Sequence, residues 1–338
     1  MIRKAVITLA VTVTAVSAAA AAIDKRIIGG EEANDSDFPF IVSIGSSAEG
    51  LSNHICGGTL LDNTTVLTAA HCLKGANYVR AGTKDLSKSA VVGKVEFVKA
   101  HPDYKPGSSR RGGGPFAIND IAILKLSTPI EKSNKIKYAT LPKDDSDPVV
   151  NSTAVTAGWG IQVSLEHGTV YQDDKLHKIE IPVHPREDCS EVTPDAASRD
   201  TIICAGGHGK NVFTLDSGGP LIDQETGRLI GVVVAGIRDI QYPSIYTKVG
   251  SYIPFITEYL GPVSNPDPTA RPITEAREEK LRPAILLREQ VKNYCEKFAE
   301  NVFDCFSFAG YCKGLQKPDG NMDEVFQCMD KKLDVTRQ

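Results

Sequence analysis

The stretch TTVLTAAHC (residues 64–72) joins a short run of β-branched and apolar residues to a histidine and a cysteine. β-branched residues favour extended strands, because two heavy atoms on Cβ restrict χ1 and pack well on a pleated surface. The run shows no spacing of three and four residues and is short for a helix. It therefore predicts a strand that ends near His71.

Runs of the same kind recur from Ile27 to about Leu260, separated by Gly, Pro, Asn and Asp. Among them are PFIVSIG (39–45), DIAILKL (120–126), STAVTAGWG (152–160) and RLIGVVVAG (228–236). Many short strands at this spacing indicate an all-β barrel or sandwich. The main candidate helix is SYIPFITEYL (251–260), which we expect to close the domain.

The composition changes after this helix. Residues 263–272 are rich in proline and polar residues and are expected to form a linker. Residues 273–338 place apolar residues at spacings of three and four, which predicts a small α-helical extension. Its four cysteines allow three pairings that the sequence does not separate, and two disulfides would help so small a unit to fold. They are Cys295, Cys305, Cys312 and Cys328.

The N-terminus has the organisation of a secretory signal peptide. Arg3 and Lys4 precede an apolar run from Ala5 to Val16, and small residues follow to Ala22. The alternative, a membrane anchor, requires about 20 strongly apolar residues, and this run is short and diluted with alanine and threonine. We therefore expect residues 1–22 to be removed and the protein to be secreted and extracellular.

Composition and cysteine content agree with a secreted globular protein. The 338 residues, 41% of them hydrophobic, suffice for a large core, and the net charge of −4 does not suggest nucleic acid or an anionic membrane as a partner. In a secreted chain the eight cysteines are expected to form disulfides rather than metal sites. Glycosylation sequons occur at Asn34, Asn63 and Asn151.

Three distant segments supply the residue types that nucleophilic catalysis requires. VLTAAHC contains His71, INDIAILKL contains Asp120 and DSGGP contains Ser217. A serine hydroxyl needs a base to accept its proton, and the imidazole needs a carboxylate to fix its tautomer. Each residue has a plainer interpretation when taken alone, as a structural histidine, a turn aspartate or a flexible turn. The order His, Asp, Ser along the chain is one of the known orders for these three residues in nucleophilic catalysis.

Five segments together carry a family resemblance: RIIGG (26–30), LTAAHC (67–72), NDIAILKL (119–126), AGWG (157–160) and DSGGP (216–220). The chain closely resembles the secreted trypsin/chymotrypsin-like serine proteases from Ile27 to Leu260. The resemblance implies an all-β catalytic domain over residues 27–262, with two six-stranded antiparallel β-barrels and a C-terminal helix. It also implies an active site between the barrels and disulfides that pair Cys56 with Cys72 and Cys189 with Cys204.

The resemblance further implies an activation step. Cleavage after Arg26 would remove a short propeptide (residues 23–26) and free the ammonium of Ile27, which in relatives pairs with the carboxylate beside the nucleophile, here Asp216. A buried aspartate without a cation is costly, which favours this interpretation. The alternative is that Lys25 and Arg26 form a dibasic processing site with no activating role.

Leu215 departs from the family pattern. Relatives have a glycine there and use its backbone N–H, with that of Ser217, as the oxyanion hole. Leucine keeps the backbone N–H, but its side chain would crowd the substrate or turn this N–H away from the oxyanion. Losing one such donor costs about 100- to 1000-fold in rate. Phe213 also replaces a family cysteine whose partner is missing too, so no unpaired thiol is left behind.

The specificity pocket departs as well. Asn211 stands where trypsin-like members have an aspartate, so a substrate Arg or Lys would lack a counter-ion. Gly236 matches one glycine of the pocket wall, whereas Ser244 replaces the other and would narrow the pocket. We therefore expect no strong Arg/Lys preference, and neutral side chains of small to medium size before the cleaved bond. The alternative is that Asp239, in the same loop, turns its carboxylate inward.

The sequence thus predicts a secreted serine endopeptidase that acts through an acyl-enzyme on protein or peptide substrates. The alternative is a catalytically impaired homologue that serves as a protein-binding or inhibitory module. The C-terminal extension would be either a partner-binding domain or a stabilising cap. We expect a monomer, protein protease inhibitors as further partners, no nucleic-acid or membrane partner, and no cofactor or metal, since residues 79–96 do not show a calcium-binding cluster.

Overall fold

The computed structural model of the chain describes residues 30–48, 53–107, 116–163, 170–172, 174–235, 241–261 and 271–272. The first half contains β1 (Glu31–Glu32), β2 (Ile41–Gly45), β3 (His54–Leu60), β4 (Thr65–Thr68), η2 (Ala70–Leu73), β5 (Tyr78–Ala81), β6 (Val91–Ala100) and β7 (Ala122–Leu126). The second half contains β8 (Thr153–Gly158), β9 (Gln162–Val163), β10 (Val170–Tyr171), β11 (His177–His184), η3 (Arg186–Cys189), η4 (Ala196–Ser198), β12 (Ile202–Ala205), β13 (Pro220–Asp223), β14 (Leu229–Ala235), β15 (Ser244–Lys248), η5 (Val249–Tyr252), α1 (Ile253–Glu258) and β16 (Arg271–Pro272).

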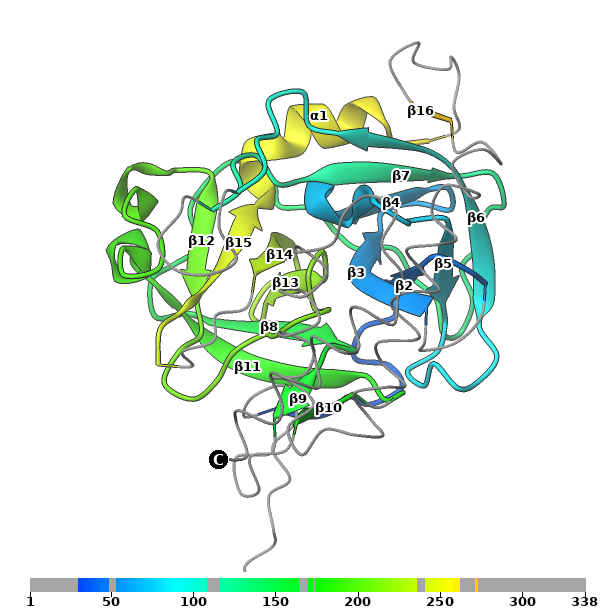
Figure 1. The fold of residues 1–338 in the computed structure, drawn as a ribbon, viewed down its shortest axis with the longest axis horizontal. Helices are drawn as coiled ribbons and strands as arrows, with labels where there is room; N and C mark the ends of the chain where they lie inside the picture. The colour runs from blue at the N-terminus through cyan, green and yellow to red at the C-terminus, as the bar shows by residue number, and fades with distance from the viewer. Residues whose placement is uncertain are drawn as a thin grey trace, which may run out of the picture.

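The strands form two closed antiparallel barrels of six strands each. The first follows the order β6-β5-β2-β3-β4-β7 and closes where β6 pairs with β7. The second follows β11-β12-β15-β14-β13-β8 and closes where β11 pairs with β8. Figure 1 shows the first barrel in blue and cyan beside the second in green and yellow. This architecture confirms the fold class that the sequence and its family resemblance predict.

Strand β6 closes the first barrel because it pairs with two strands, β5 and β7. Its first residues, Val91 to Lys94, pair with β5, and those from Val95 to Ala100 pair with β7. The register shifts between Val95 and Phe97, which marks a bulge. A bulge bends a strand and increases its local twist, so one continuous strand can turn the corner that barrel closure requires.

Each of the five quoted β-branched runs contains a strand, namely β2, β4, β7, β8 and β14. All residues of β2, β4 and β7 are buried, as expected for strands whose inner faces fill a barrel and whose outer faces are covered. The predicted helix over 251–260 is present in two parts, since η5 leads into the six-residue α1. Pro254 lies in the first turn of α1, where a missing N–H costs nothing.

A buried lysine holds the end of α1 against the first barrel. Lys125, 1% exposed, donates from Nζ to Thr65 Oγ1 at 2.7 Å, to Tyr259 O at 3.0 Å and to Gly261 O at 2.6 Å. Asp62 completes the contact by accepting from the Gly261 N–H at 2.7 Å. Burial lowers the pKa of Lys125, and the nearby Asp62 carboxylate opposes that shift. We call these five residues the lysine clamp.

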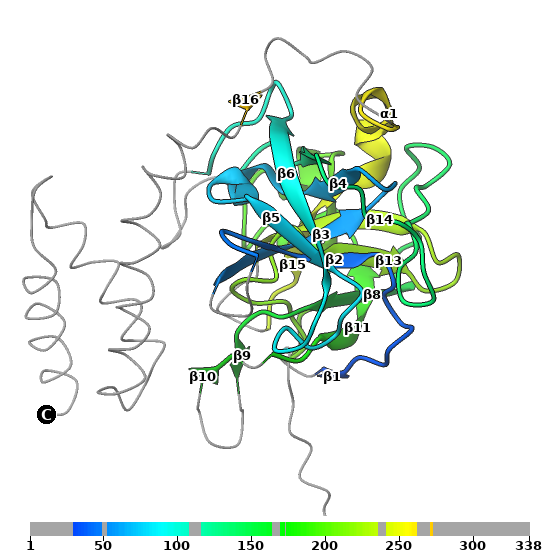
Figure 2. The same cartoon turned by 90° about the vertical axis from the view of Figure 1, so that its right-hand side faces the viewer.

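The remaining elements lie outside the barrels. In both views α1 lies at one end of the molecule and the β9–β10 hairpin at the opposite end (Figures 1 and 2). Strand β1 pairs with β11, and β16, inside the predicted linker, pairs with β6 at Phe97 and Val98. In the described residues no helix has the length and apolar character needed to cross a membrane. The predicted signal peptide, propeptide and helical extension lie outside the described residues.

Candidate active site

His71 and Asp120 meet because neighbouring strands deliver them to one end of the first barrel. His71 lies in η2 just after β4, and Asp120 lies two residues before β7. The two strands are paired, with Thr68 opposite Ala122. The His71 Nδ1 atom lies 2.6 Å from Asp120 Oδ2, and the His71 backbone N–H donates to Oδ1 at 2.9 Å.

This contact fixes the tautomer of the imidazole. Asp120 is 1% exposed and its ionised carboxylate can only accept hydrogen bonds, so Nδ1 of His71 must carry the proton. The Nε2 atom of the neutral ring then presents a lone pair. The half-buried imidazole can therefore accept a proton as a general base while Asp120 stabilises the resulting cation.

Ser217 lies on the turn before β13 in the second barrel, and a hydrogen bond joins this turn to the first barrel. The Gly57 N–H of β3 donates to Ser217 O at 2.8 Å. A Cβ at Gly57 would lie 2.9 Å from the Gly219 Cα, so this approach requires glycine on β3. The Ser217 Oγ donates to Val234 O at 3.4 Å.

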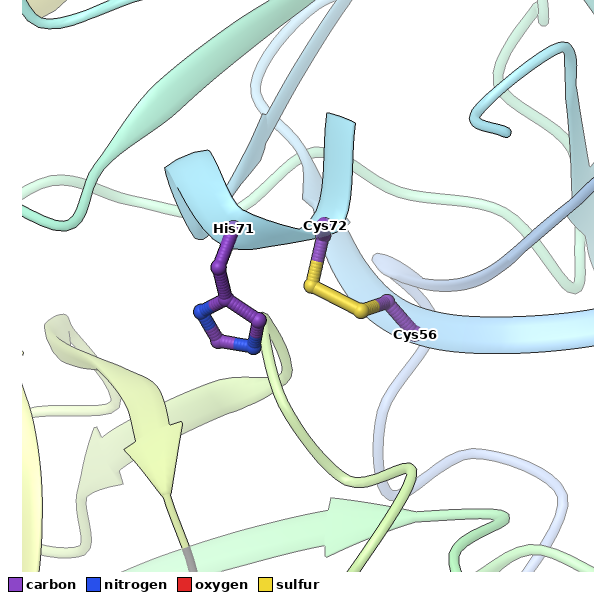
Figure 3. A group of neighbouring side chains, drawn as sticks. All are labelled: Cys56, His71 and Cys72. Carbon is purple, nitrogen blue, oxygen red and sulfur yellow. A yellow bond between two sulfur atoms is a disulfide. The ribbon is translucent and has the colours of Figure 1, made fainter. Parts of the chain in front are cut away.

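A disulfide connects the same point to His71. Cys56, which precedes Gly57, is bonded to Cys72, which follows His71, with an S–S length of 1.96 Å (Figure 3). Ser217, Gly57, Cys56, Cys72 and His71 thus form one continuous path of covalent and hydrogen bonds. The donor atoms of Cys56, His71 and Cys72 lie within 4.8 Å of one another, but the disulfide uses both sulfurs, so this group is not a metal centre.

The second disulfide lies in the second barrel and joins Cys189 to Cys204, with an S–S length of 2.04 Å. Both cysteines are fully buried. Residues 295–328, which contain the other four cysteines, lie outside the described residues.

Leu215 occupies its position with an unusual backbone. Its φ is +77°, in the left-handed region that leucine rarely adopts. The described part of the chain provides no hydrogen-bond acceptor for the backbone N–H of Leu215 or that of Ser217. An anionic oxygen would therefore meet no competing acceptor from the described residues at either N–H.

His54 supports the Leu215 peptide and was not identified from the sequence. Its Nε2 lies 3.2 Å from Leu215 O, and because a carbonyl only accepts, Nε2 carries the proton. Its Nδ1 then accepts from the Ser43 hydroxyl at 2.8 Å. A histidine at the start of a strand carries no local signal of this role, since its partner is 161 residues away.

Asp216 is buried next to Ser217 and is held by backbone N–H groups. It is 1% exposed and accepts from the Gly160 N–H and the Phe213 N–H, each at 2.9 Å. A Cβ at Gly158 or Gly160 would overlap its carboxylate, so these two glycines make the room for it. Burial raises the pKa of Asp216 to about 6, although the two N–H donors act to lower it.

Asn211 and Ser244 are brought together as neighbours at the expected pocket. Both are fully buried, and the Ser244 hydroxyl donates to Asn211 Oδ1 at 2.6 Å. The Asn211 Nδ2 donates to Tyr242 O at 2.7 Å, so each end of the amide has a partner. Phe213 is 7% exposed. The other predicted pocket and activation residues, Gly236, Asp239, Arg26 and Ile27, lie outside the described residues.

Comparisons with known proteins identify the family of this chain. The family model described as Trypsin matches residues 27–256. Trypsin alpha of Drosophila melanogaster is 33% identical over 235 residues, covering 67% of this chain and 84% of the relative. The venom peptide isomerase heavy chain of Agelenopsis aperta is 32% identical over 257 residues, covering 69% of this chain and 100% of the relative.

A solved structure is similar over the same region. Neuropsin, described as a serine protease expressed in the limbic system of mouse brain, matches with a TM-score of 0.58 and 26% identity, covering 69% of this chain and 99% of that protein. The predicted family resemblance is thereby confirmed from the sequence and from the fold. The chain belongs to the trypsin family and is a serine endopeptidase.

Proposed function

We propose that this protease cleaves peptide bonds with Ser217 as nucleophile, His71 as general base and Asp120 as the residue that orients His71. The single observation that carries the proposal is the short contact of 2.6 Å between His71 Nδ1 and the buried Asp120 carboxylate. This contact leaves Nε2 of His71 as the proton acceptor. The hydrogen bond from the Gly57 N–H to Ser217 O holds the Ser217 turn next to the Cys56–Cys72 disulfide, which also adjoins His71. The serine attacks the carbonyl, His71 takes the serine proton and gives it to the departing amine, and water then releases the acyl group.

The backbone N–H groups of Leu215 and Ser217 are proposed to bind the oxyanion of the tetrahedral intermediate. Their freedom from other acceptors among the described residues supports this role. The hydrogen bond from His54 to Leu215 O stabilises the orientation of that peptide. Preorganised donors of this kind stabilise charge as it develops, without a reorganisation cost at the moment of reaction.

Activation is proposed to follow cleavage after Arg26. The buried Asp216 carboxylate, whose pKa burial raises to about 6, is the observation that supports this step. The new ammonium of Ile27 would supply the cation that Asp216 needs to ionise in a buried site. Removal of the signal peptide, followed by cleavage of the bond between Arg26 and Ile27, is the expected route.

Substrate choice is proposed to exclude a strong preference for Arg or Lys. The Asn211 amide is neutral and is held by Ser244 and Tyr242 O, so it offers no negative charge to a substrate cation. A buried cation without a counter-ion is strongly disfavoured. Neutral side chains of small to medium size are the expected residues before the cleaved bond.

The test is labelling and turnover of the purified chain that begins at Ile27. A peptidyl phosphonate or sulfonyl fluoride probe is expected to modify Ser217, with no labelling of Ser217→Ala. His71→Ala should reduce kcat by about 10,000-fold or more, the range seen for other serine proteases that lose a member of this triad. Ser251→Ala, which removes a hydroxyl that donates to Asp145 Oδ1, is the matched serine control and should still be labelled. Hydrolysis unchanged in Ser217→Ala would contradict the proposal.

A further inference from the structure

The backbone of Asp120 is held by a side chain of the second barrel. Thr247, 3% exposed in β15, donates from its hydroxyl to Asp120 O at 3.0 Å. Asp120 itself belongs to the first barrel, since it lies two residues before β7. The bond therefore crosses from one barrel to the other and joins residues that are 127 positions apart in the sequence.

The residue before Asp120 is held from the same side. Asn119 has a φ of +52°, in the left-handed region that asparagine adopts more readily than most residues. The Tyr252 hydroxyl, in η5 directly after β15, donates to Asn119 Oδ1 at 2.7 Å, and Asn119 Nδ2 donates to Asp103 O at 3.0 Å. Tyr252 is 4% exposed, so its hydroxyl is a fixed partner. One segment, residues 247–252, thus holds two consecutive residues of the first barrel.

Asp120 lies at the centre of a three-residue turn, because the Ile121 N–H donates to Asn119 O at 2.9 Å. The direction of its side chain therefore follows the orientation of this turn. Its carboxylate is occupied by His71, whose backbone N–H lies 2.9 Å from Oδ1 and whose Nδ1 lies 2.6 Å from Oδ2. Among the described residues, no side chain of the second barrel donates to this carboxylate, so the second barrel orients it through the backbone turn.

The strand that contains Thr247 is also connected to Ser217. Thr247 is opposite Val232 of β14, and the register of this strand pair shifts at Val234, which marks a bulge. A bulge re-aims the residue that it contains. Val234 O accepts from Ser217 Oγ at 3.4 Å. The β14–β15 pair thus contacts Asp120 through one strand and Ser217 through the other.

We propose that Thr247 and Tyr252 are positioning residues, which hold Asp120, and through it His71, in place relative to Ser217. The inference rests on the proposed triad. The base and the nucleophile lie on different barrels, so a small shift of the Asp120 turn would separate them. A misplacement of about 1 Å costs on the order of 100-fold in rate. Both hydroxyls bind the Asp120 turn and not the predicted specificity pocket, so the loss is expected in kcat rather than in KM.

The experiment compares kcat and KM for peptide hydrolysis by the purified chain that begins at Ile27, with active sites counted by complete reaction with the phosphonate probe. Thr247→Val keeps the shape of the side chain and removes the hydroxyl. Its kcat is expected to fall about 10- to 100-fold while KM stays within about twofold. Thr247→Ser keeps the donor and is expected to restore most of kcat. Tyr252→Phe should lower kcat in the same direction, by less, because it acts on the neighbouring residue.

Thr193→Val is the matched control. Thr193 is a fully buried threonine between η3 and η4 whose hydroxyl donates to Asp195 Oδ1 at 2.6 Å, and its variant should keep the parent kcat. The proposal would be overturned by a parent kcat in Thr247→Val, by a loss seen only in KM, or by an equal fall of kcat in Thr247→Ser or in Thr193→Val. If Thr247→Val does not fold, an unchanged kcat in Tyr252→Phe would overturn it. A parent chain that the probe does not label would refute the proposed function, and this inference with it.

Discussion

Leu215 holds a backbone conformation that costs a leucine free energy. A left-handed residue with a Cβ costs about 1–2 kcal/mol, whereas glycine there costs about 0.5–1 kcal/mol in lost backbone entropy. The φ of +77° is retained because the Asp216 turn and the His54 hydrogen bond fix both sides of the peptide. Strain of this kind persists where the surrounding structure determines it, and it concentrates at functional sites.

We predict that Leu215→Gly folds and hydrolyses peptides at least as well as the parent. Glycine keeps the N–H donor, relieves the strained φ and removes a side chain next to the nucleophile, so kcat/KM should rise and the free energy of unfolding should change by less than about 1 kcal/mol. Urea unfolding and steady-state kinetics measure both. Leu215→Val is the control, and it should be less stable because β-branching disfavours positive φ further. A tenfold fall in kcat/KM for Leu215→Gly would show that the leucine side chain assists catalysis.

We predict that Asn211→Asp gains preference for Arg or Lys before the cleaved bond and loses stability. The new carboxylate would supply a counter-ion, but it would face Tyr242 O, which now accepts from the Asn211 amide at 2.7 Å. Losing that donor in a buried site should cost about 1–3 kcal/mol. Profiling with a peptide library and urea unfolding measure the two effects. Asn211→Ser, which is neutral, should show no gain, and a parent protease that already cuts mainly after Arg or Lys would refute the assignment.

The lysine clamp explains how α1, a helix of only six residues, remains packed against the first barrel. Isolated helices of this length are unstable in water, so α1 depends on tertiary contacts. The clamp satisfies the carbonyls of Tyr259 and Gly261, which follow the helix and have no helical partner. We therefore expect the clamp to set how far the chain must extend for the catalytic domain to fold.

We predict that a chain ending at Pro262 folds and remains active, whereas one ending at Glu258 does not. The shorter chain lacks both carbonyls and leaves the buried Lys125 ammonium without two of its acceptors, which should cost about 3 kcal/mol or more. Thermal unfolding and peptide hydrolysis measure the difference. Lys125→Met in the chain ending at Pro262 is the matched variant and should fall between the two. A folded but inactive chain ending at Pro262 would show that the C-terminal extension completes the active site.

The molecule as a whole is expected to respond to pH differently before and after cleavage at Arg26. Burial raises the pKa of Asp216 from 3.8 to about 6. A carboxyl group whose pKa is raised on folding binds its proton more tightly in the folded state. Below about pH 4 the carboxyl group is protonated in both states, so its raised pKa does not lower the free energy of unfolding. As the pH rises to about 6, the group ionises in the unfolded state, and the free energy of unfolding falls by up to ~3 kcal/mol.

We predict that the uncleaved chain, held by Arg26→Gln in a Ser217→Ala background, gains stability as the pH falls from 7 to 5. The cleaved chain that begins at Ile27 should lack this gain, because its ammonium would pair with the Asp216 carboxylate and keep the pKa low. Urea unfolding of both forms across this range measures the difference, and other titrating groups cancel in the comparison. Asp216→Asn should abolish the extra gain in stability that the uncleaved chain shows over the cleaved chain. If the free energy of unfolding changed equally with pH in the two forms, the pairing of the Ile27 ammonium with the Asp216 carboxylate would be contradicted.

The sequence by itself determined the strands and the catalytic residue types. β-branched runs such as TTVLTAAHC prefer extended backbone whatever their partners, so local chemistry was enough to find β2, β4, β7, β8 and β14. The division into two barrels and the pairing of distant cysteines came instead from the family resemblance, because strand periodicity does not specify which strands close on each other.

Only the tertiary structure decided how these residues act on one another. The Nδ1 proton of His71, the support of Leu215 by His54, and the burial of Asp216 each depend on contacts across many residues of sequence. The left-handed backbone of Leu215 likewise ran against the local preference of leucine. Hydrogen bonds, burial and strain are properties of atoms brought together by folding, and a residue's neighbours in sequence do not reveal them.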